Sequence, residues 1–330
     1  MHLTKEKLFH QAVLDSGSVT ARHAKPFGSE IPEAQFRDFA VEAGCGDRPG
    51  DETMACLRSQ DAEKLVKASA EIFNRYNNGE AWAFQPVVDG DLIAKAPIDA
   101  WVAGEWNKVP LFSGFSTDEA STFVPSAIDT AKDYEQYFRD RVPWMTDAHF
   151  ETLNKLYLDP LVHPDSPYKE TRPIDVGSQF KRLVSSYGHY RYICPAKQTA
   201  HFAADDVPVY LHSWPLPDSM KLGARHGIIV PYQVHHDGRC GGTAAQKKVA
   251  GYAHAYYTSF ITTGDPNKMK GPFGDRPEWK PFHPVTAPDN VMVFGEKNDE
   301  CLGGSRPGTA AELKETNWLN PKCDFWFGII

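Results

Sequence analysis

Short apolar runs that end in turn-forming residues recur along the chain. The first run spans residues 8–14 and is followed directly by Asp15, Ser16, Gly17 and Ser18. An apolar run that stops at such a polar cluster is typical of a buried strand that opens into a turn. The same pattern predicts three further strands, at 84–90, 109–115 and 207–214.

Between these runs, apolar residues recur at steps of three and four. In 31–43 the side chains of Phe36, Phe39 and Ala40 follow this spacing, and Pro32 suits the first turn of a helix. Strands that alternate with segments of helical length favour an α/β fold, with a central, mostly parallel sheet flanked by helices. The same spacing predicts further helices at 61–75, 182–204 and 249–262.

Two regions depart from this alternation. A helical insertion is predicted near 134–172, and the Gly- and His-rich stretch 218–242 is predicted to be irregular. Within that stretch, His235 and His236 are adjacent, and we expect a surface loop rather than a metal site because neighbouring side chains point apart. No internal repeat or low-complexity linker divides the chain, so residues 1–330 are interpreted as one domain.

The composition is ordinary for a globular protein, with 41% hydrophobic and 24% charged residues. A formal net charge of −8 and the lack of any Lys/Arg run argue against a nucleic-acid partner. No apolar stretch approaches the roughly 18 residues that span a bilayer, so no membrane span is predicted. Residues 1–10 lack the apolar core of a secretory signal, so we expect no export signal in this chain.

The cysteine pattern bears on both metal binding and disulfides. None of the cysteines forms a Cys-x-x-Cys pair, so neither a metal nor another cofactor is predicted. Cys45 and Cys56 are eleven residues apart with the turn-forming Pro49 and Gly50 between them, which allows either a disulfide or two free thiols. The six cysteines are Cys45, Cys56, Cys194, Cys240, Cys301 and Cys323.

Seven short motifs occur in a fixed order along the chain. They are Leu8-Phe9-His10 with Asp15-Ser16-Gly17-Ser18, Gly44-Cys45 with Cys56-Leu57, Pro86-Val87-Val88-Asp89-Gly90, Val109-Pro110-Leu111 with Asp118-Glu119, Cys194-Pro195 with Cys323-Asp324-Phe325-Trp326, His226-Gly227, and Gly264-Asp265-Pro266-Asn267 with Trp279. Together they resemble segments of the type-B carboxylesterases, the family that includes cholinesterases and fungal lipases. The resemblance covers essentially the whole chain and implies an α/β-hydrolase fold.

The resemblance implies the chemistry of a Ser-Glu-His triad, with Glu119 as the acid and His226 as the base. In such a triad the histidine takes the proton of a serine nucleophile and returns it to the leaving alcohol, while the acid fixes the histidine tautomer. In α/β-hydrolases the order along the chain is serine, acid, histidine, and Glu119 precedes His226 here. The implied substrate is a small-molecule carboxylic ester, and the implied reaction uses no cofactor.

The resemblance also implies two disulfides. By analogy with the family, Cys45 pairs with Cys56, and Cys194 pairs with Cys323. Disulfides persist in oxidising compartments, so the resemblance implies a secreted protein or one in another oxidising compartment. The two cysteines without a counterpart in the family are Cys240 and Cys301.

One member of the triad has no counterpart in residues 1–330. The chain contains no Gly-x-Ser-x-Gly pattern, the nucleophile elbow of the family, and no Gly-rich oxyanion loop precedes Glu119. We therefore expect the C-terminal portion of a type-B carboxylesterase domain, N-terminally truncated and inactive or nearly so alone. The alternatives are a substitute nucleophile at Ser16 or Ser18, and a non-catalytic binding protein that pairs with a complementary hydrolase half.

Overall fold

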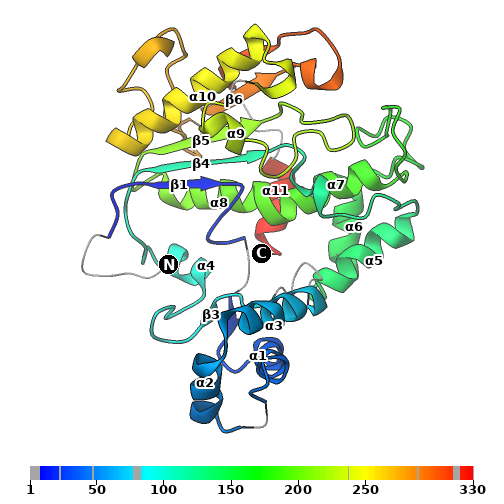
Figure 1. The fold of residues 1–330 in the computed structure, drawn as a ribbon. Coiled ribbons are helices and arrows are strands. Elements are labelled where there is room, and N and C mark those ends of the chain that lie inside the picture. Colours follow the sequence, from blue (N-terminus) through cyan, green and yellow to red (C-terminus); the bar gives the residue numbers. More distant parts are fainter. Residues whose placement is uncertain are drawn as a thin grey trace.

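The centre of the computed structural model is a five-stranded sheet (Figure 1). In spatial order its strands are β1 (Ala12–Asp15), β4 (Leu111–Ser116), β5 (Val209–Trp214), β6 (Val291–Glu296) and β7 (Thr309–Lys314). The first four run parallel and β7 runs antiparallel to β6, which confirms the predicted mostly parallel sheet. The structure describes residues 8–21, 24–46, 48–76, 83–236, 238–287, 290–314 and 320–329.

Strands β4 and β5 are buried along their whole length. In β4, Leu111 and Phe115 point into one apolar core and Phe112 points into the other, because successive side chains of a strand face opposite sides of the sheet. Burial on both faces explains the nearly continuous apolar runs of these strands. The strands predicted at 109–115 and 207–214 therefore match β4 and β5 to within two residues.

The other two predicted strands are shorter than expected. The run 8–14 becomes a strand only at Ala12, where pairing with Leu111 of β4 begins. In the run 84–90 only Val87–Val88 forms a strand, β3, which pairs with β2 (Lys25–Pro26) in a separate two-stranded sheet. Both strands are shorter than predicted because only the residues that pair with a neighbouring strand, β4 or β2, form a strand.

Helices cover both faces of the central sheet (Figure 1). On one face, α7 (Phe180–Gly188), α8 (Cys194–Ala203) and α11 (Asn320–Phe327) enclose the larger apolar core. On the other face, α10 (Ala244–Thr263) closes a second core that includes Trp279. This layered arrangement confirms the predicted α/β class.

The predicted helices at 182–204 and 249–262 both have counterparts. The first corresponds to α7 and α8, which are joined without a break by a π-helical turn at His189–Ile193. The second lies within α10 and is extended at its start, where the Thr243 side chain caps the helix by accepting from the backbone N–H of Gln246.

Three helices form a group of their own at the bottom of Figure 1. They are α1 (Glu30–Glu42), α2 (Gly50–Ser59) and α3 (Ala62–Arg75), of which α1 and α3 pack against each other. Helices α1 and α3 match the helices predicted at 31–43 and 61–75 to within one residue at each end. Helix α2 lies in a region for which no helix was predicted.

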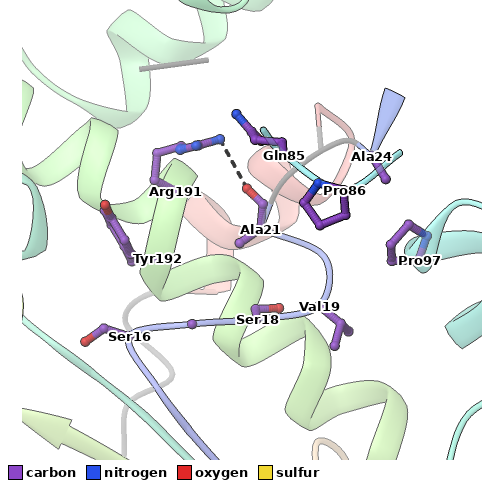
Figure 2. Close-up of a pocket in the computed structure, with 11 residues that line it drawn as sticks. Ser16, Ser18, Val19, Ala21, Ala24, Gln85, Pro86, Pro97, Arg191 and Tyr192 are labelled. Atoms are coloured by element: carbon purple, nitrogen blue, oxygen red, sulfur yellow. Dashed lines mark hydrogen bonds between the residues drawn. The ribbon is translucent and has the colours of Figure 1, made fainter. Parts of the chain in front are cut away.

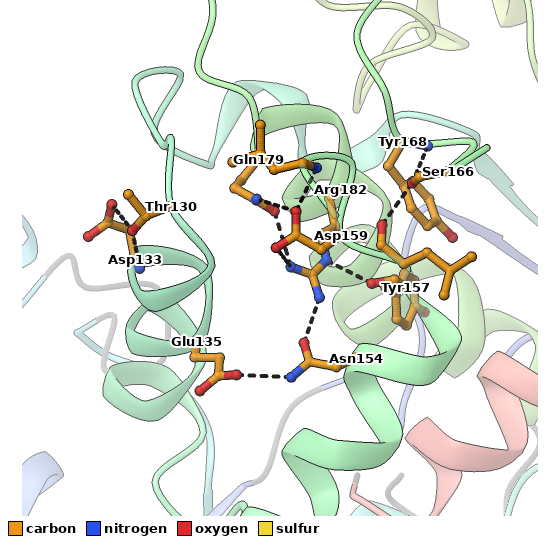
Figure 3. A network of polar contacts seen from close by, with 12 residues as sticks. Thr130, Asp133, Glu135, Asn154, Tyr157, Asp159, Ser166, Tyr168, Gln179 and Arg182 are labelled. Atoms are coloured by element: carbon orange, nitrogen blue, oxygen red, sulfur yellow. Dashed lines mark hydrogen bonds and ion pairs between the residues drawn. The ribbon is translucent and has the colours of Figure 1, made fainter. Parts of the chain in front are cut away.

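A buried arginine links the helices beyond β4 to the sheet-covering layer (Figure 3). Arg182 of α7 donates through Nε to the backbone oxygen of Tyr157 at 2.7 Å, and its guanidinium lies 3.8 Å from the ring centroid of Tyr134. The segment 134–172, predicted as a helical insertion, contains most of α5 (Ala131–Arg141) and all of α6 (Asp147–Leu156).

Two shorter helices complete the described α-helices. They are α4 (Pro97–Val102) and α9 (Val230–Gln233).

Three disulfides join segments that are separated along the chain. The expected pairs Cys45–Cys56 and Cys194–Cys323 are both present and are thus confirmed. The third disulfide, Cys240–Cys301, joins the two cysteines whose state the sequence left open. Among the described residues, no helix is both long and apolar enough to cross a membrane.

Candidate active site

Glu119 lies in the loop that follows β4 and is completely buried. One of its carboxylate oxygens, Oε1, accepts from the backbone N–H of Ser116 at 2.7 Å and from the Ser16 hydroxyl at 2.5 Å. The other oxygen, Oε2, lies 2.7 Å from Nδ1 of His226. Because a buried carboxylate needs hydrogen bonds to compensate for lost hydration, these contacts fix its orientation.

His226 lies in the loop after β5, with its side chain about one-third exposed at 34%. The rings of Tyr192 and Phe123 flank the imidazole, with centroids 4.8 Å and 5.4 Å away. In the described part of the chain, Nε2 has no hydrogen-bond partner, whereas Nδ1 faces Glu119. A histidine held in this way presents Nε2 to take up a proton, which is the arrangement of a general base oriented by an acid.

Backbone pairing holds the two loops of this site together. The Asp118 N–H donates to the Ala224 backbone oxygen at 3.0 Å, and the Ala224 N–H donates to Oδ2 of Asp118 at 3.0 Å. Gly223 has a φ of +59°, and a Cβ there would lie 2.5 Å from Oδ2 of Asp118, so only glycine fits. The neighbours of Glu119 and His226 along the chain are therefore in direct contact.

The two serines proposed as substitute nucleophiles lie in different surroundings. Ser16 has a φ of 51° and its hydroxyl donates to Glu119 rather than to His226. The Ser18 hydroxyl lies 2.5 Å from Oγ1 of Thr199 and 2.9 Å from the backbone oxygen of Pro195, against the start of α8. Ser16 thus contributes to the site as a partner of the acid, a role that the sequence did not indicate.

A cavity of about 250 Å³ lies next to Ser16, the residue whose hydroxyl donates to Glu119 (Figure 2). Ser16 and Tyr192 border one side of it, and Tyr192 is also the residue that packs on the His226 ring. Arg191, whose Nη1 donates to the Ala21 backbone oxygen at 3.2 Å, borders the cavity next to Tyr192, and Gln85 lies near it. The lining is predominantly apolar, as is usual where proteins bind small organic molecules. Its apolar members include Val19, Ala21, Ala24, Pro86 and Pro97.

The adjacent histidines of the irregular region lie apart from this site. His235 is exposed, and its ring stacks on that of His254 at a centroid distance of 5.3 Å. Within the described ranges, no group of three or more His, Cys, Asp or Glu side chains is placed to hold a metal ion. The irregular stretch 218–242, as predicted, contains little regular structure apart from α9 and a short turn at Arg239–Gly241.

Comparison with known proteins identifies the family of the chain. The sequence model of the carboxylesterase family matches residues 1–326. The chain belongs to the carboxylesterase family.

The relatives of this carboxylesterase-family chain include fungal lipases. Secreted lipase 4 of Gibberella zeae is 29% identical over 321 residues, which cover 93% of this chain and 56% of the lipase. Lipase 1 of Geotrichum candidum is 27% identical over 280 residues, which cover 79% of this chain and 46% of that lipase. The chain thus spans about half the length of the curated relatives it matches.

A solved structure has the same fold. The crystal structure of Aspergillus niger EstA superposes with a TM-score of 0.69 and 23% sequence identity, covering 99% of this chain and 61% of EstA. At this level of identity the likeness concerns the fold alone. It agrees with the α/β-hydrolase arrangement implied by the sequence motifs.

Proposed function

We propose that this chain supplies the acid and the base of a Ser-Glu-His carboxylic ester hydrolase. The observation that carries the proposal is the 2.7 Å contact between Glu119 Oε2 and His226 Nδ1, which leaves Nε2 without a partner among the described residues. Ser16, which contacts Glu119, and Tyr192, which packs on the His226 ring, both line the apolar cavity. Two further donors hold the carboxylate, so the pair is preorganised for proton transfer. The substrate is a small-molecule carboxylic ester whose apolar part occupies the cavity.

The reaction proceeds through an acyl-enzyme. A serine oxygen attacks the ester carbonyl carbon while Nε2 of His226 takes the serine proton, and Glu119 stabilises the imidazolium that forms. Collapse of the tetrahedral intermediate breaks the bond to the alcohol oxygen, and His226 returns the proton to that oxygen. Water then hydrolyses the acyl-enzyme by the same steps, releasing the carboxylic acid and regenerating the serine.

The serine in this proposal comes from a segment outside residues 1–330, because these residues contain no Gly-x-Ser-x-Gly pattern. In the described sheet, β1 is a terminal strand paired with β4 alone, and Val13 of β1 is exposed at 37%. An unpaired edge with apolar side chains invites a further strand. A complementary hydrolase segment that adds to β1 would lie next to Ser16 and the acid–base pair.

The relatives named secreted lipases and the three disulfides support an extracellular location for the protein. An extracellular medium is oxidising, and the three disulfides persist there.

Hydrolysis of p-nitrophenyl butyrate by purified residues 1–330, beside His226→Ala, tests whether the nucleophile is external. We expect neither protein to exceed the buffer rate, since loss of a triad serine typically lowers kcat by about six orders of magnitude. An organophosphorus probe should likewise leave Ser16 and Ser18 unmodified. Turnover that disappears in His226→Ala, together with an adduct on Ser16, would assign the nucleophile to this chain and overturn the proposal.

A further inference from the structure

A small ion cluster lies directly beside the loop that carries His226. The Asp218 carboxylate bridges two arginines: Oδ2 accepts from Nε of Arg225 at 2.5 Å, and Oδ1 accepts from Nη2 of Arg239. The Asp218 and Arg239 side chains are mostly buried, with 16% and 24% exposed, so solvent screens these contacts less than on an open surface. Arg225 immediately precedes His226, and its Nη1 donates to the His226 backbone oxygen at 3.1 Å.

The charge state of Asp218 agrees with a bridging role. Burial alone would raise the pKa of Asp218, but hydrogen bonds from Arg225 and Arg239 hold that pKa below its ordinary value. The carboxylate is therefore ionised at neutral pH, and each arginine has a charged partner.

The far end of the cluster is covalently anchored. Arg239 is followed by Cys240, which is bonded to Cys301 in the turn after β6. Next to Cys301, the Glu300 carboxylate accepts from the hydroxyl of Thr243, the residue that caps α10, at 2.8 Å. A continuous path thus runs from β6 and α10 through the disulfide, Arg239, Asp218 and Arg225 to His226.

This loop needs such support for a geometric reason. It contains Gly223 and Gly227, both with positive φ, and it has no strand or α-helix between Trp214 and Val230. The Asp118–Ala224 backbone pair restrains the loop on the side of Glu119. The ion cluster is a second restraint on the same loop, and a triad histidine displaced by about 1 Å can lose on the order of a hundredfold in rate.

We propose that Asp218 and Arg239, anchored by the Cys240–Cys301 disulfide, are positioning residues that keep Nδ1 of His226 on Glu119. The inference rests on the proposed function of the Glu119–His226 pair. It adds a set of contacts that keeps the two side chains within hydrogen-bond distance. It also gives the third disulfide a role, because reduction would release Arg239 from its anchor.

The low-field proton resonance of the His226 Nδ1–H tests this proposal in residues 1–330 without any nucleophile. A histidine N–H held by a buried carboxylate gives a distinct, exchange-protected signal, which Glu119→Gln and His226→Ala assign by removing it. We expect Asp218→Asn to broaden it and to speed its exchange with water roughly tenfold, since local opening of the loop governs exchange. Replacing Cys240 and Cys301 together by serine should act in the same direction.

Asp38→Asn is the matched control, because Asp38 of α1 also accepts from an arginine, Arg75 of α3, at 3.0 Å, in the α1–α3 group. We expect it to leave the resonance unchanged, while thermal melting verifies that each variant is folded. An unchanged resonance in folded Asp218→Asn would overturn the positioning role, and its absence from the wild type would overturn the Glu119–His226 pairing itself. An intact resonance in a protein that fails to support hydrolysis with an added nucleophile would instead count against the proposed function.

Discussion

At the scale of single residues, one glycine makes room for a buried polar network behind the active-site strands. A Cβ on Gly114 would lie 2.1–2.2 Å from atoms of the His212 ring. That ring is held by Asp15, whose Oδ1 lies 2.9 Å from Nε2 of His212 and accepts from the Tyr257 hydroxyl at 2.8 Å. The backbone oxygen of Gly114 also accepts from the N–H of Ser16 at 2.8 Å, so this position supports the residue that contacts Glu119.

Gly114→Ala is therefore expected to destabilise the fold. The added methyl group must displace a fully packed ring, and overpacking of this kind costs about 1–3 kcal/mol or more. Gly50→Ala, at the start of α2 with nothing within 4 Å of its Cβ, should be neutral or slightly stabilising. Urea denaturation of both variants measures the difference, and equal free energies of unfolding would show that the His212 ring yields without cost.

Of the residues at the candidate site, the sequence predicted only those that lie within family motifs. Glu119 and His226 stand in recognisable segments, and the structure brings them into contact. Ser16 contacts Glu119 across 103 residues of sequence, and Tyr192 packs on His226 from the π-helical turn His189–Ile193, so no local pattern could reveal these contacts. Cys240–Cys301 was undetected for the same reason.

At the scale of elements, the π-helical turn His189–Ile193 buries an imidazole between α7 and α8. His189 is almost fully buried, with Nδ1 2.7 Å from the Tyr157 hydroxyl. Burial, with smaller repulsion from Lys322 and Lys197, lowers the pKa of His189 to about 3. His189 is therefore neutral in the folded protein at neutral pH.

The stability of the protein should consequently fall in acid. Because the pKa of His189 is lower in the folded state than the 6.5 of the unfolded chain, the unfolded state takes up the extra proton. The stability that the neutral His189 contributes is fully present above pH 6.5. Between pH 6.5 and pH 3 the free energy of unfolding decreases by up to about 1.4 kcal/mol per pH unit because of this group. Denaturation of His189→Gln should show a shallower loss, whereas the exposed His163→Gln should follow the wild type. Parallel curves for all three proteins would contradict this account.

Strands that are buried on both faces were predicted from the sequence, whereas a strand that depends on pairing with a neighbouring strand was not. Strands β4 and β5 were predicted because both faces are apolar. Strand β7 has the sequence Thr-Ala-Ala-Glu-Leu-Lys, which favours a helix, and it is a strand because it pairs with β6. Helix α2 buries only Thr53 and Leu57, too sparse a pattern to detect.

At the scale of the whole molecule, the disulfides differ in how much chain they constrain. Cys194–Cys323 closes 129 residues and attaches α11 to α8, whereas Cys45–Cys56 closes only 11 residues within the α1–α3 group. In the chain-entropy account, the longer loop restricts the unfolded state more.

Removing these two disulfides separately should thus have unequal effects. Serine at both Cys194 and Cys323 is expected to lower the free energy of unfolding by about 5 kcal/mol, against about 3 kcal/mol for the Cys45–Cys56 pair. Urea denaturation monitored by tryptophan fluorescence compares them directly. A larger loss from the Cys45–Cys56 pair would show that native-state packing, rather than loop length, sets the contribution.

The overall architecture was predictable because several weak motifs occur in one order, and membership in the carboxylesterase family confirms that interpretation. What the sequence could not supply is the arrangement of the loops around His226, which depends on the Asp118–Ala224 pairing and on the ion cluster at Asp218. The Asp118–Ala224 pairing joins residues 106 positions apart, and the ion cluster forms within an irregular loop that has no repeating pattern, so both become visible only in the folded chain.

The central claim is that Glu119 and His226 act as acid and base for a nucleophile from outside residues 1–330. The most direct test uses a fusion protein. A fragment of a family member that carries a Gly-x-Ser-x-Gly elbow but no acid–base pair is joined upstream of Met1, and hydrolysis of p-nitrophenyl butyrate is measured. The account predicts turnover by the fusion and a loss of at least roughly a thousandfold in the same fusion with His226→Ala. Equal turnover by the two fusions would contradict it.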